Sequence, residues 1–115
     1  MCIVTGFGDV DEKGTSPDYL QHVYVNVAKH SDCKTLYQQM GTLVDESMIC
    51  AGKLKGMYDS CEGDSGGPLV CRHSVGLDYY LHGVVSWGEG CGIVKQYGVY
   101  ANVIYFLDWI KRNTV

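Results

Sequence analysis

The chain has 115 residues, a length that suits one domain with a hydrophobic core of its own. Nine basic against thirteen acidic side chains give a net charge of −4, so there is no basic excess for holding nucleic acid. No apolar run approaches the roughly 18 residues of a membrane-spanning helix, and 46% hydrophobic residues is too many for a disordered chain. We therefore expect a single domain over residues 1–115, with neither nucleic acid nor a membrane as partner.

Fifteen glycines and nine tyrosines favour many turns and β-strands over a bundle of helices. The first strand is expected at residues 2–7, followed by a polar turn at residues 9–14. Residues 19–27 alternate between two faces and should form the second strand. Its buried face is expected to carry three valines, Val23, Val25 and Val27.

A short helix is expected at residues 31–37, with Ser31 or Asp32 as its N-cap. Four further strands are bounded by glycine-rich or polar segments and are expected at residues 48–51, 68–71, 81–87 and 98–103. Apolar residues from Val103 onward then recur at helical spacing, which predicts a C-terminal α-helix that is capped by Asn102 and packs on the strands. The sequence thus predicts an all-β fold, a six-stranded antiparallel barrel with one C-terminal helix.

Six cysteines, an even number without closely spaced C-x-x-C pairs, indicate disulfides rather than a zinc site. A metal-binding domain built on cysteine and histidine is the weaker alternative. Disulfides form in oxidising compartments, so we expect a secreted, extracellular protein. No secretory signal follows Met1, which suggests that the beginning of the full protein is missing.

The most informative stretch surrounds Ser65, which has Gly63 two residues before it and Gly67 two residues after it. Such a serine can sit on a tight turn with its hydroxyl exposed and backbone N–H groups converging nearby, as acyl transfer requires. The same spacing fits the nucleophile elbow of the α/β-hydrolases, but that elbow leads into a helix, and Pro68 here begins a predicted strand. A glycine-rich surface turn is the plain alternative for so short a motif.

The longer string GDSGGPL at residues 63–69 resembles the nucleophile motif of the trypsin/chymotrypsin-like serine proteases. Further segments resemble the same family in the same order, namely CIVTGFG at 2–8, MICAG at 48–52, VVSWG at 84–88, and GVY at 98–100 with WI at 109–110. The resemblance covers essentially the whole chain. It implies the second, C-terminal Greek-key barrel of a trypsin-like double barrel, and three disulfides, Cys2–Cys71, Cys33–Cys50 and Cys61–Cys91.

The resemblance also implies the catalytic roles. Ser65 would be the nucleophile, and the backbone N–H groups of Gly63 and Ser65 would form the oxyanion hole. None of the histidines, His22, His30, His73 and His82, stands in the family's context for the catalytic base, and no aspartate matches its orienting partner. We therefore expect the base and its partner to come from an N-terminal barrel that this chain lacks.

Asp59 matches the residue at the floor of the family's primary specificity pocket. A confined carboxylate favours a guanidinium or ammonium group, because an unpaired buried charge is costly, so cleavage after arginine or lysine is expected. Ser60 adds a hydroxyl that helps lysine to compete, and Gly88 and Gly98 would line the pocket walls. An ordinary surface aspartate is the alternative.

Ser86, Trp87 and Gly88 would pair with an extended polypeptide substrate as an added strand. Tyr97 resembles the tyrosine of family members that bind Na⁺, and no other cofactor is expected. The sequence hypothesis is thus a secreted trypsin-like endopeptidase, whose partners are polypeptide substrates, protein protease inhibitors and the N-terminal barrel. The competing hypothesis is a non-catalytic protease homologue or binding module.

Overall fold

The computed structural model describes residues 1–8, 15–52, 65–73, 76, 78–88 and 97–114. Their elements follow the expected order, with bounds mostly within one or two residues of those expected. They are β1 (Cys2–Gly6), β2 (Gln21–Val27), α1 (His30–Gln39), β3 (Met48–Gly52), β4 (Pro68–Arg72), β5 (Tyr79–Gly88), β6 (Gly98–Asn102) and α2 (Val103–Asn113). The turn expected at residues 9–14 lies outside the described residues.

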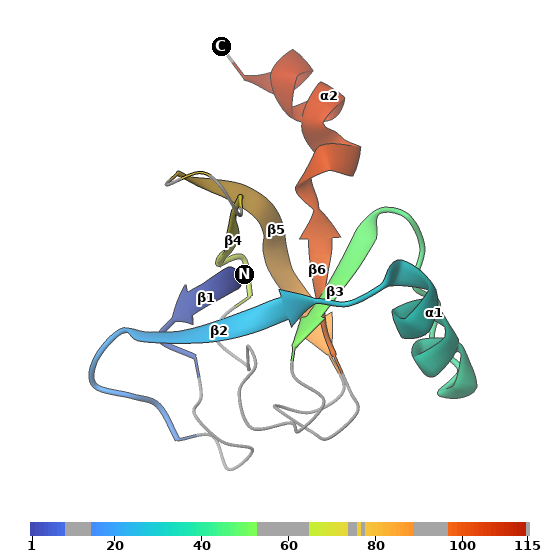
Figure 1. The fold of residues 1–115 in the computed structure, drawn as a ribbon, viewed down its shortest axis with the longest axis horizontal. Coiled ribbons are helices and arrows are strands. Elements are labelled where there is room, and N and C mark those ends of the chain that lie inside the picture. The colour runs from blue at the N-terminus through green and yellow to red at the C-terminus, as the bar shows by residue number, and fades with distance from the viewer. Residues whose placement is uncertain (9–14, 53–64, 74–75, 77, 89–96, 115) are drawn as a thin grey trace.

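The strands form one closed antiparallel barrel in the order β1-β2-β3-β6-β5-β4 (Figure 1). Because β4 returns to lie beside β1, the first four strands form a Greek key. The expected fold class, a six-stranded Greek-key barrel with a C-terminal helix, is confirmed.

Strand β1 closes the barrel by pairing with β2 on one side and β4 on the other. Cys2 lies opposite Val25 in β2 and opposite Cys71 in β4. The expected disulfide Cys2–Cys71 is formed and joins β1 to β4 across a sequence separation of 69 residues. A bridge over so long a loop typically stabilises a fold by about 2–5 kcal/mol, largely by restricting the unfolded chain.

Strands β3 and β6 bury side chains on both of their faces. Ala51 and Tyr100 point into the barrel, whereas their chain neighbours Cys50 and Val99 point outward against α1. Side chains alternate along a strand, so two buried faces require a core on each side. The inner cluster consists of Cys2, Val4, Val25, Ala51, Leu69, Cys71, Val85 and Tyr100.

Helix α1 covers the outer face of β3, to which the expected disulfide Cys33–Cys50 attaches it. The N-cap is Lys29, and its side chain makes no capping hydrogen bond, so the expected cap at Ser31 or Asp32 is wrong. The helix starts one residue earlier than expected because the turn is closed by backbone bonds, from the N–H groups of Asp32 and Cys33 to the Lys29 carbonyl.

Helix α2 projects away from the barrel and has no fully buried residue (Figure 1). Asn102 is its N-cap, as expected, but the side-chain amide donates to the Glu46 carbonyl (3.2 Å) instead of capping the helix. The helix packs mainly near β5, where an apolar cleft of about 280 Å³ is lined by Val84, Ala101, Val103, Phe106, Trp109 and Ile110. The expected packing on the barrel is therefore only partial, and Trp109 is 58% exposed.

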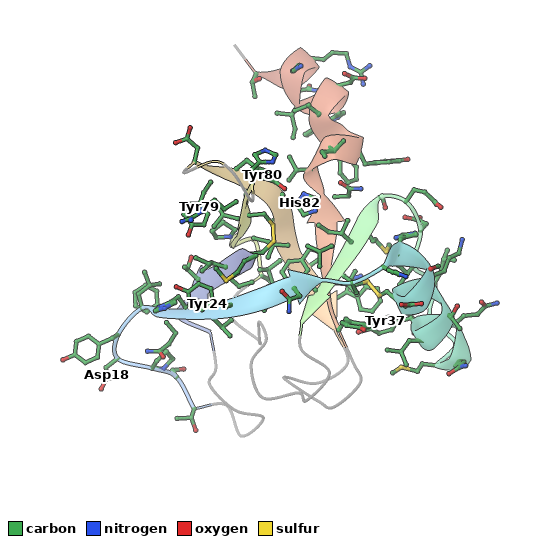
Figure 2. All side chains as sticks on the ribbon, viewed as in Figure 1. Asp18, Tyr24, Tyr37, Tyr79, Tyr80 and His82 are labelled. Atoms are coloured by element: carbon green, nitrogen blue, oxygen red, sulfur yellow. A yellow bond between two sulfur atoms is a disulfide. The ribbon has the colours of Figure 1, made fainter. Side chains whose placement is uncertain are left out.

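Two further details correct or extend the sequence analysis. Of the three valines expected to be buried in β2, Val27 at the strand end is 41% exposed. On β5, the half-buried His82 packs edge-on against Tyr80, and both residues are labelled in Figure 2. Burial disfavours the charged imidazolium and so lowers the pKa of His82.

In the part of the chain that the structure describes, neither helix is long and apolar enough to span a membrane.

Replacing Gly83 with alanine is expected to destabilise the barrel. A Cβ atom at this position would lie 3.0 Å from Cβ of Tyr100 and 3.1 Å from Cδ1 of Ile49, inside the filled barrel. Overpacking of this kind costs about 1–3 kcal/mol, which urea unfolding would measure. Gly76→Ala is the matched control, since its new Cβ would meet, among the described residues, only an ordinary contact with His73 at 3.6 Å. Equal stability losses in the two variants would contradict the packing argument.

Candidate active site

Ser65 lies on an exposed turn that leads directly into β4. Gly66, the next residue, has φ +84°, in the left-handed region that glycine adopts without steric cost. The glycine after the serine therefore has a conformational reason to be there. The turn leads into a strand and not into a helix, which agrees with the sequence argument against a hydrolase elbow.

Two backbone hydrogen bonds fix the turn against β5. The N–H of Gly66 donates to the carbonyl of Val85 (2.9 Å), and the N–H of Val85 donates to the carbonyl of Gly67 (2.9 Å). Pro68 then pairs with Val84 as β4 begins. Continuing this antiparallel register backwards brings Ser65 beside the segment of β5 that follows Val85.

That segment of β5 contains a bulge that turns Trp87 outward. Val85 pairs with Tyr100 and points into the barrel, but the next pairing in the ladder joins Trp87 to Val99. Ser86 is the extra residue, and it is exposed. Regular alternation would have turned Trp87 inward like Val85, whereas the bulge places it in the outer cluster under α1.

The described pairing of β5 differs on its two sides. Among the described residues, the ladder on the β4 side ends at Val85, whereas the ladder on the β6 side continues to a pair formed by Gly88 and Gly98. Four of the expected site residues thus lie at the same end of the barrel. They are Ser65, Ser86, Trp87 and Gly88. Gly98 joins them through its pairing with Gly88.

The four histidines lie elsewhere. His73 follows the far end of β4, at the opposite end from Ser65, and His82 lies three residues before Val85 on β5. His22 is on β2, which β1 separates from β4, and His30 is the first residue of α1. The strand register and the position of α1 place none of these described side chains beside Ser65.

Several expected site residues lie outside the described residues, and their roles stay predictions. They are Asp59, Ser60, Gly63, and the cysteines Cys61 and Cys91 of the third disulfide. The sodium site expected near Tyr97 is also still a prediction. In the described ranges, no group of three or more histidine, cysteine or acidic side chains is arranged to hold a metal ion.

Sequence reasoning missed Tyr37, which it treated only as the end of a short helix. The side chain is fully buried in the outer cluster and packs edge-on against Trp87, with ring centroids 5.1 Å apart. Its hydroxyl donates a hydrogen bond to the carbonyl of Tyr97. The available signal was spacing, because Tyr37 follows Cys33 by four residues and so shares the helix face that carries the disulfide.

Comparison with known proteins gives a match over nearly the whole chain. A protein-family model described as Trypsin matches residues 1–110. The chain is 46% identical over 113 residues to Trypsin-1 of Astacus astacus, covering 98% of this chain and 46% of that protein.

Two longer relatives match the same region. The chain is 44% identical over 112 residues to Transmembrane protease serine 9 of Rattus norvegicus, covering 96% of this chain and 10% of that protein. It is 40% identical over 114 residues to Mannan-binding lectin serine protease 1 of Rattus norvegicus, covering 99% of this chain and 16% of that protein. The chain therefore spans less than half the length of each of these three relatives.

Gly66→Ala is expected to destabilise the chain by about 1–2 kcal/mol, because an L-residue with a Cβ atom is strained at φ +84°. Among the described residues, a new Cβ atom there would meet nothing within 4 Å, so the expected loss is conformational. Gly66→Asn is the matched control, since asparagine tolerates the left-handed region better than alanine. Urea unfolding should rank the three chains glycine, asparagine, alanine, and an alanine variant as stable as the parent would contradict this assignment.

Proposed function

Because the chain belongs to the trypsin family of serine proteases, we propose that it is the nucleophile-bearing half of an endopeptidase that cleaves after arginine or lysine. The family membership supports a serine protease hydrolase. The cleavage preference, the identity of the nucleophile and the need for a second half are the proposal.

The observation that carries the proposal is the pair of hydrogen bonds between the Gly66–Gly67 segment and Val85. These bonds hold the turn of Ser65 against β5, whose residues after Val85 are paired with β6. A peptide that paired with the other edge of β5, on the β4 side, would present its carbonyl groups close to the serine hydroxyl. Binding and bond cleavage would then use adjacent parts of one barrel end.

The proposed reaction is acyl transfer through Ser65. Its Oγ attacks the carbonyl carbon of the substrate, and its proton passes to a histidine base. The N–H groups of Gly63 and Ser65 stabilise the oxyanion of the tetrahedral intermediate. That intermediate collapses as the proton passes to the leaving amine, and water then attacks the acyl-enzyme, releases the new carboxyl terminus and regenerates the hydroxyl.

Substrate preference is assigned to Asp59, which matches the family's pocket-floor residue in sequence, and to Ser60, the next residue in the chain. A carboxylate there would pair with an arginine or lysine side chain and reject apolar residues, which would leave the charge unpaired. The paired glycines Gly88 and Gly98 project no side chain from the faces of β5 and β6, which supports their assignment as pocket walls. Extended loops of protein inhibitors would bind to the same edge as substrates.

We propose that the base and its carboxylate partner come from an N-terminal barrel outside this chain. The positions of the four described histidines away from Ser65 support this, as does the greater length of the three relatives. The apolar cleft beneath α2 and the exposed Trp109 offer a surface on which that barrel would pack. The two disulfides formed by the described cysteines support an extracellular location for the assembled protein.

The alternative is a non-catalytic homologue that uses the barrel only to bind a partner. The absence of any described histidine beside Ser65 favours it, if no second half exists. The serine turn and the acidic pocket residue argue for catalysis, because binding alone requires neither. The two functions differ in whether the assembled protein hydrolyses a substrate in a reaction that depends on Ser65.

The proposal is tested by hydrolysis of an arginine ester by the 115-residue chain, with and without a trypsin-family N-terminal barrel added in trans. The chain alone should show no turnover above Ser65→Ala, and the mixture should show turnover that Ser65→Ala abolishes. The arginine ester should be preferred to its phenylalanine analogue by at least about 100-fold, and Asp59→Ser should remove most of that preference.

Four results would count against parts of this proposal. Equal turnover by the parent and Ser65→Ala mixtures would exclude Ser65 as nucleophile, and preference for the phenylalanine ester would exclude the acidic pocket. Turnover by the chain alone, if it depends on Ser65, would show that a base is available within the chain. A mixture that forms a complex but stays inactive would favour the binding module.

A further inference from the structure

A cleft lies where helix α1 ends and the loop to β3 begins. It has a volume of about 310 Å³ and is lined by Lys34, Gln38, Gly41, Thr42, Leu43 and Val44. Figure 1 shows α1 outside the barrel beside β3, a strand that β6 separates from β5. The lining residues are therefore separate from the candidate site around Ser65, and the cleft has room for one or two side chains of another molecule.

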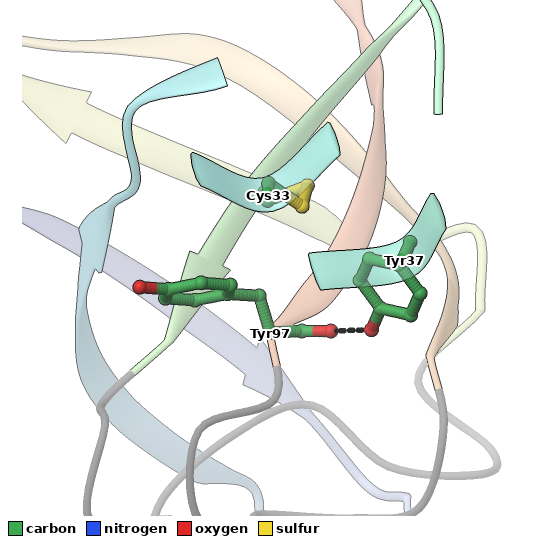
Figure 3. The surroundings of a disulfide bond; sticks show 4 residues. Cys33, Tyr37 and Tyr97 are labelled. Carbon is green, nitrogen blue, oxygen red and sulfur yellow. Dashed lines mark hydrogen bonds between the residues drawn. A yellow bond between two sulfur atoms is a disulfide. The ribbon is translucent and has the colours of Figure 1, made fainter. Parts of the chain in front are cut away.

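The cleft has a preformed base. Gly41 lets the chain leave the helix at φ +77°, and the N–H of Thr42 then donates to the carbonyl of Tyr37 (2.9 Å). Tyr37 is fully buried, and its hydroxyl donates to the carbonyl of Tyr97 (Figure 3). The disulfide Cys33–Cys50 ties the same helix to β3. Because these restraints already hold the base in place, a ligand would lose little binding energy in ordering it.

The loop after α1 places one apolar residue in the core and leaves others at the surface. Val44 is 1% exposed and packs in the outer cluster, where it anchors the loop. Leu43, the residue before it, is 71% exposed, and Met40 in the same turn is 39% exposed. Exposed apolar side chains indicate a contact surface where they gather and not where they are scattered. Leu43 beside the cleft is thus available for an apolar contact with another molecule.

The polar side of the cleft carries a single charge. Lys34 and Gln38 are four residues apart on α1, so they share one face of the helix, and no acidic residue is among the lining. Among the described residues the one ion pair joins His30 to Glu46, so Lys34 takes part in none. The acid that Lys34 influences, Asp45, already accepts hydrogen bonds from the backbone N–H and the hydroxyl of Ser47. The ammonium group of Lys34 therefore remains available to an anionic group from outside the chain.

We infer that this cleft is a docking site for an acidic segment of another protein, in which a carboxylate side chain lies close to an apolar one. The carboxylate pairs with Lys34 and accepts a hydrogen bond from the Gln38 amide, while the apolar side chain covers Leu43. The charge complementarity favours a protein segment over a nucleic acid, because the lining offers one cation and the chain carries a net charge of −4. The inference does not depend on Ser65 or on the proposed cleavage preference.

The test is a selection of short random peptides, displayed on phage, on the immobilised 115-residue chain. The enriched peptides should carry an aspartate or glutamate within about four residues of a large apolar residue, the reach of one helical turn. The strongest binder is then synthesised, and its affinity is measured by fluorescence anisotropy. Lys34→Glu should weaken binding about 5- to 10-fold, because it replaces attraction with repulsion. Leu43→Ser should weaken it about 5-fold through the loss of apolar contact.

Lys111→Glu is the matched control, because it makes the same charge change at another exposed lysine, on α2. It should leave the affinity unchanged. Unfolding curves for all variants ensure that binding is compared between folded chains. Saturating benzamidine, a small amidine that resembles the arginine head group, should not displace the peptide, since the cleft shares no lining residue with the proposed substrate pocket.

The inference is overturned if no peptide is enriched or if the enriched peptides lack acidic residues. Equal losses of affinity in Lys34→Glu and Lys111→Glu would show a general effect of charge and would likewise overturn it. Displacement by benzamidine would place the peptide in the substrate pocket instead of the cleft. Failure of the proposed function would leave this result intact, because neither Ser65 nor Asp59 lines the cleft.

Discussion

The candidate site depends on one short piece of backbone pairing, the exchange of hydrogen bonds between the Gly66–Gly67 segment and Val85. The pairing needs a left-handed residue directly after Ser65, and Gly66 supplies it. Because these bonds involve only main-chain groups, they hold the serine turn at a fixed level of β5 whatever the side chains nearby. Gly66 is therefore explained by backbone geometry before any chemistry is considered.

The second constraint is that β3 and β6 carry a core on each face. The inner core fills the barrel, and the outer core, between these strands and α1, contains the Cys33–Cys50 disulfide and Tyr37. The bulge at Ser86 assigns Trp87 to the outer core and leaves Val85 in the inner one. Strand β5 is thus packed on one face by the barrel interior, through Val85, and on the other by helix α1, through Trp87.

Much of the fold follows from the sequence because short alternating segments and glycine-rich turns specify strands, and the motif string specifies which barrel they form. The bulge at Ser86 could not be predicted in this way, since alternation assigns Val85 and Trp87 to the same face. Tyr37 was missed for a related reason, because its two partners lie about 50 and 60 residues further along the chain and no local pattern links them. The N-cap of α1 was misplaced because Ser31 and Asp32 have suitable side chains, yet backbone bonds alone close the first turn.

The central claim is that Ser65 carries the covalent chemistry at this barrel end. Its most direct test is labelling of the chain, together with the N-terminal barrel, by a biotinylated fluorophosphonate, followed by peptide mapping of the adduct by mass spectrometry. The account predicts one adduct, on Ser65, whose formation benzamidine slows. An adduct on a different residue, or hydrolysis of an arginine ester without any labelling of Ser65, would contradict it.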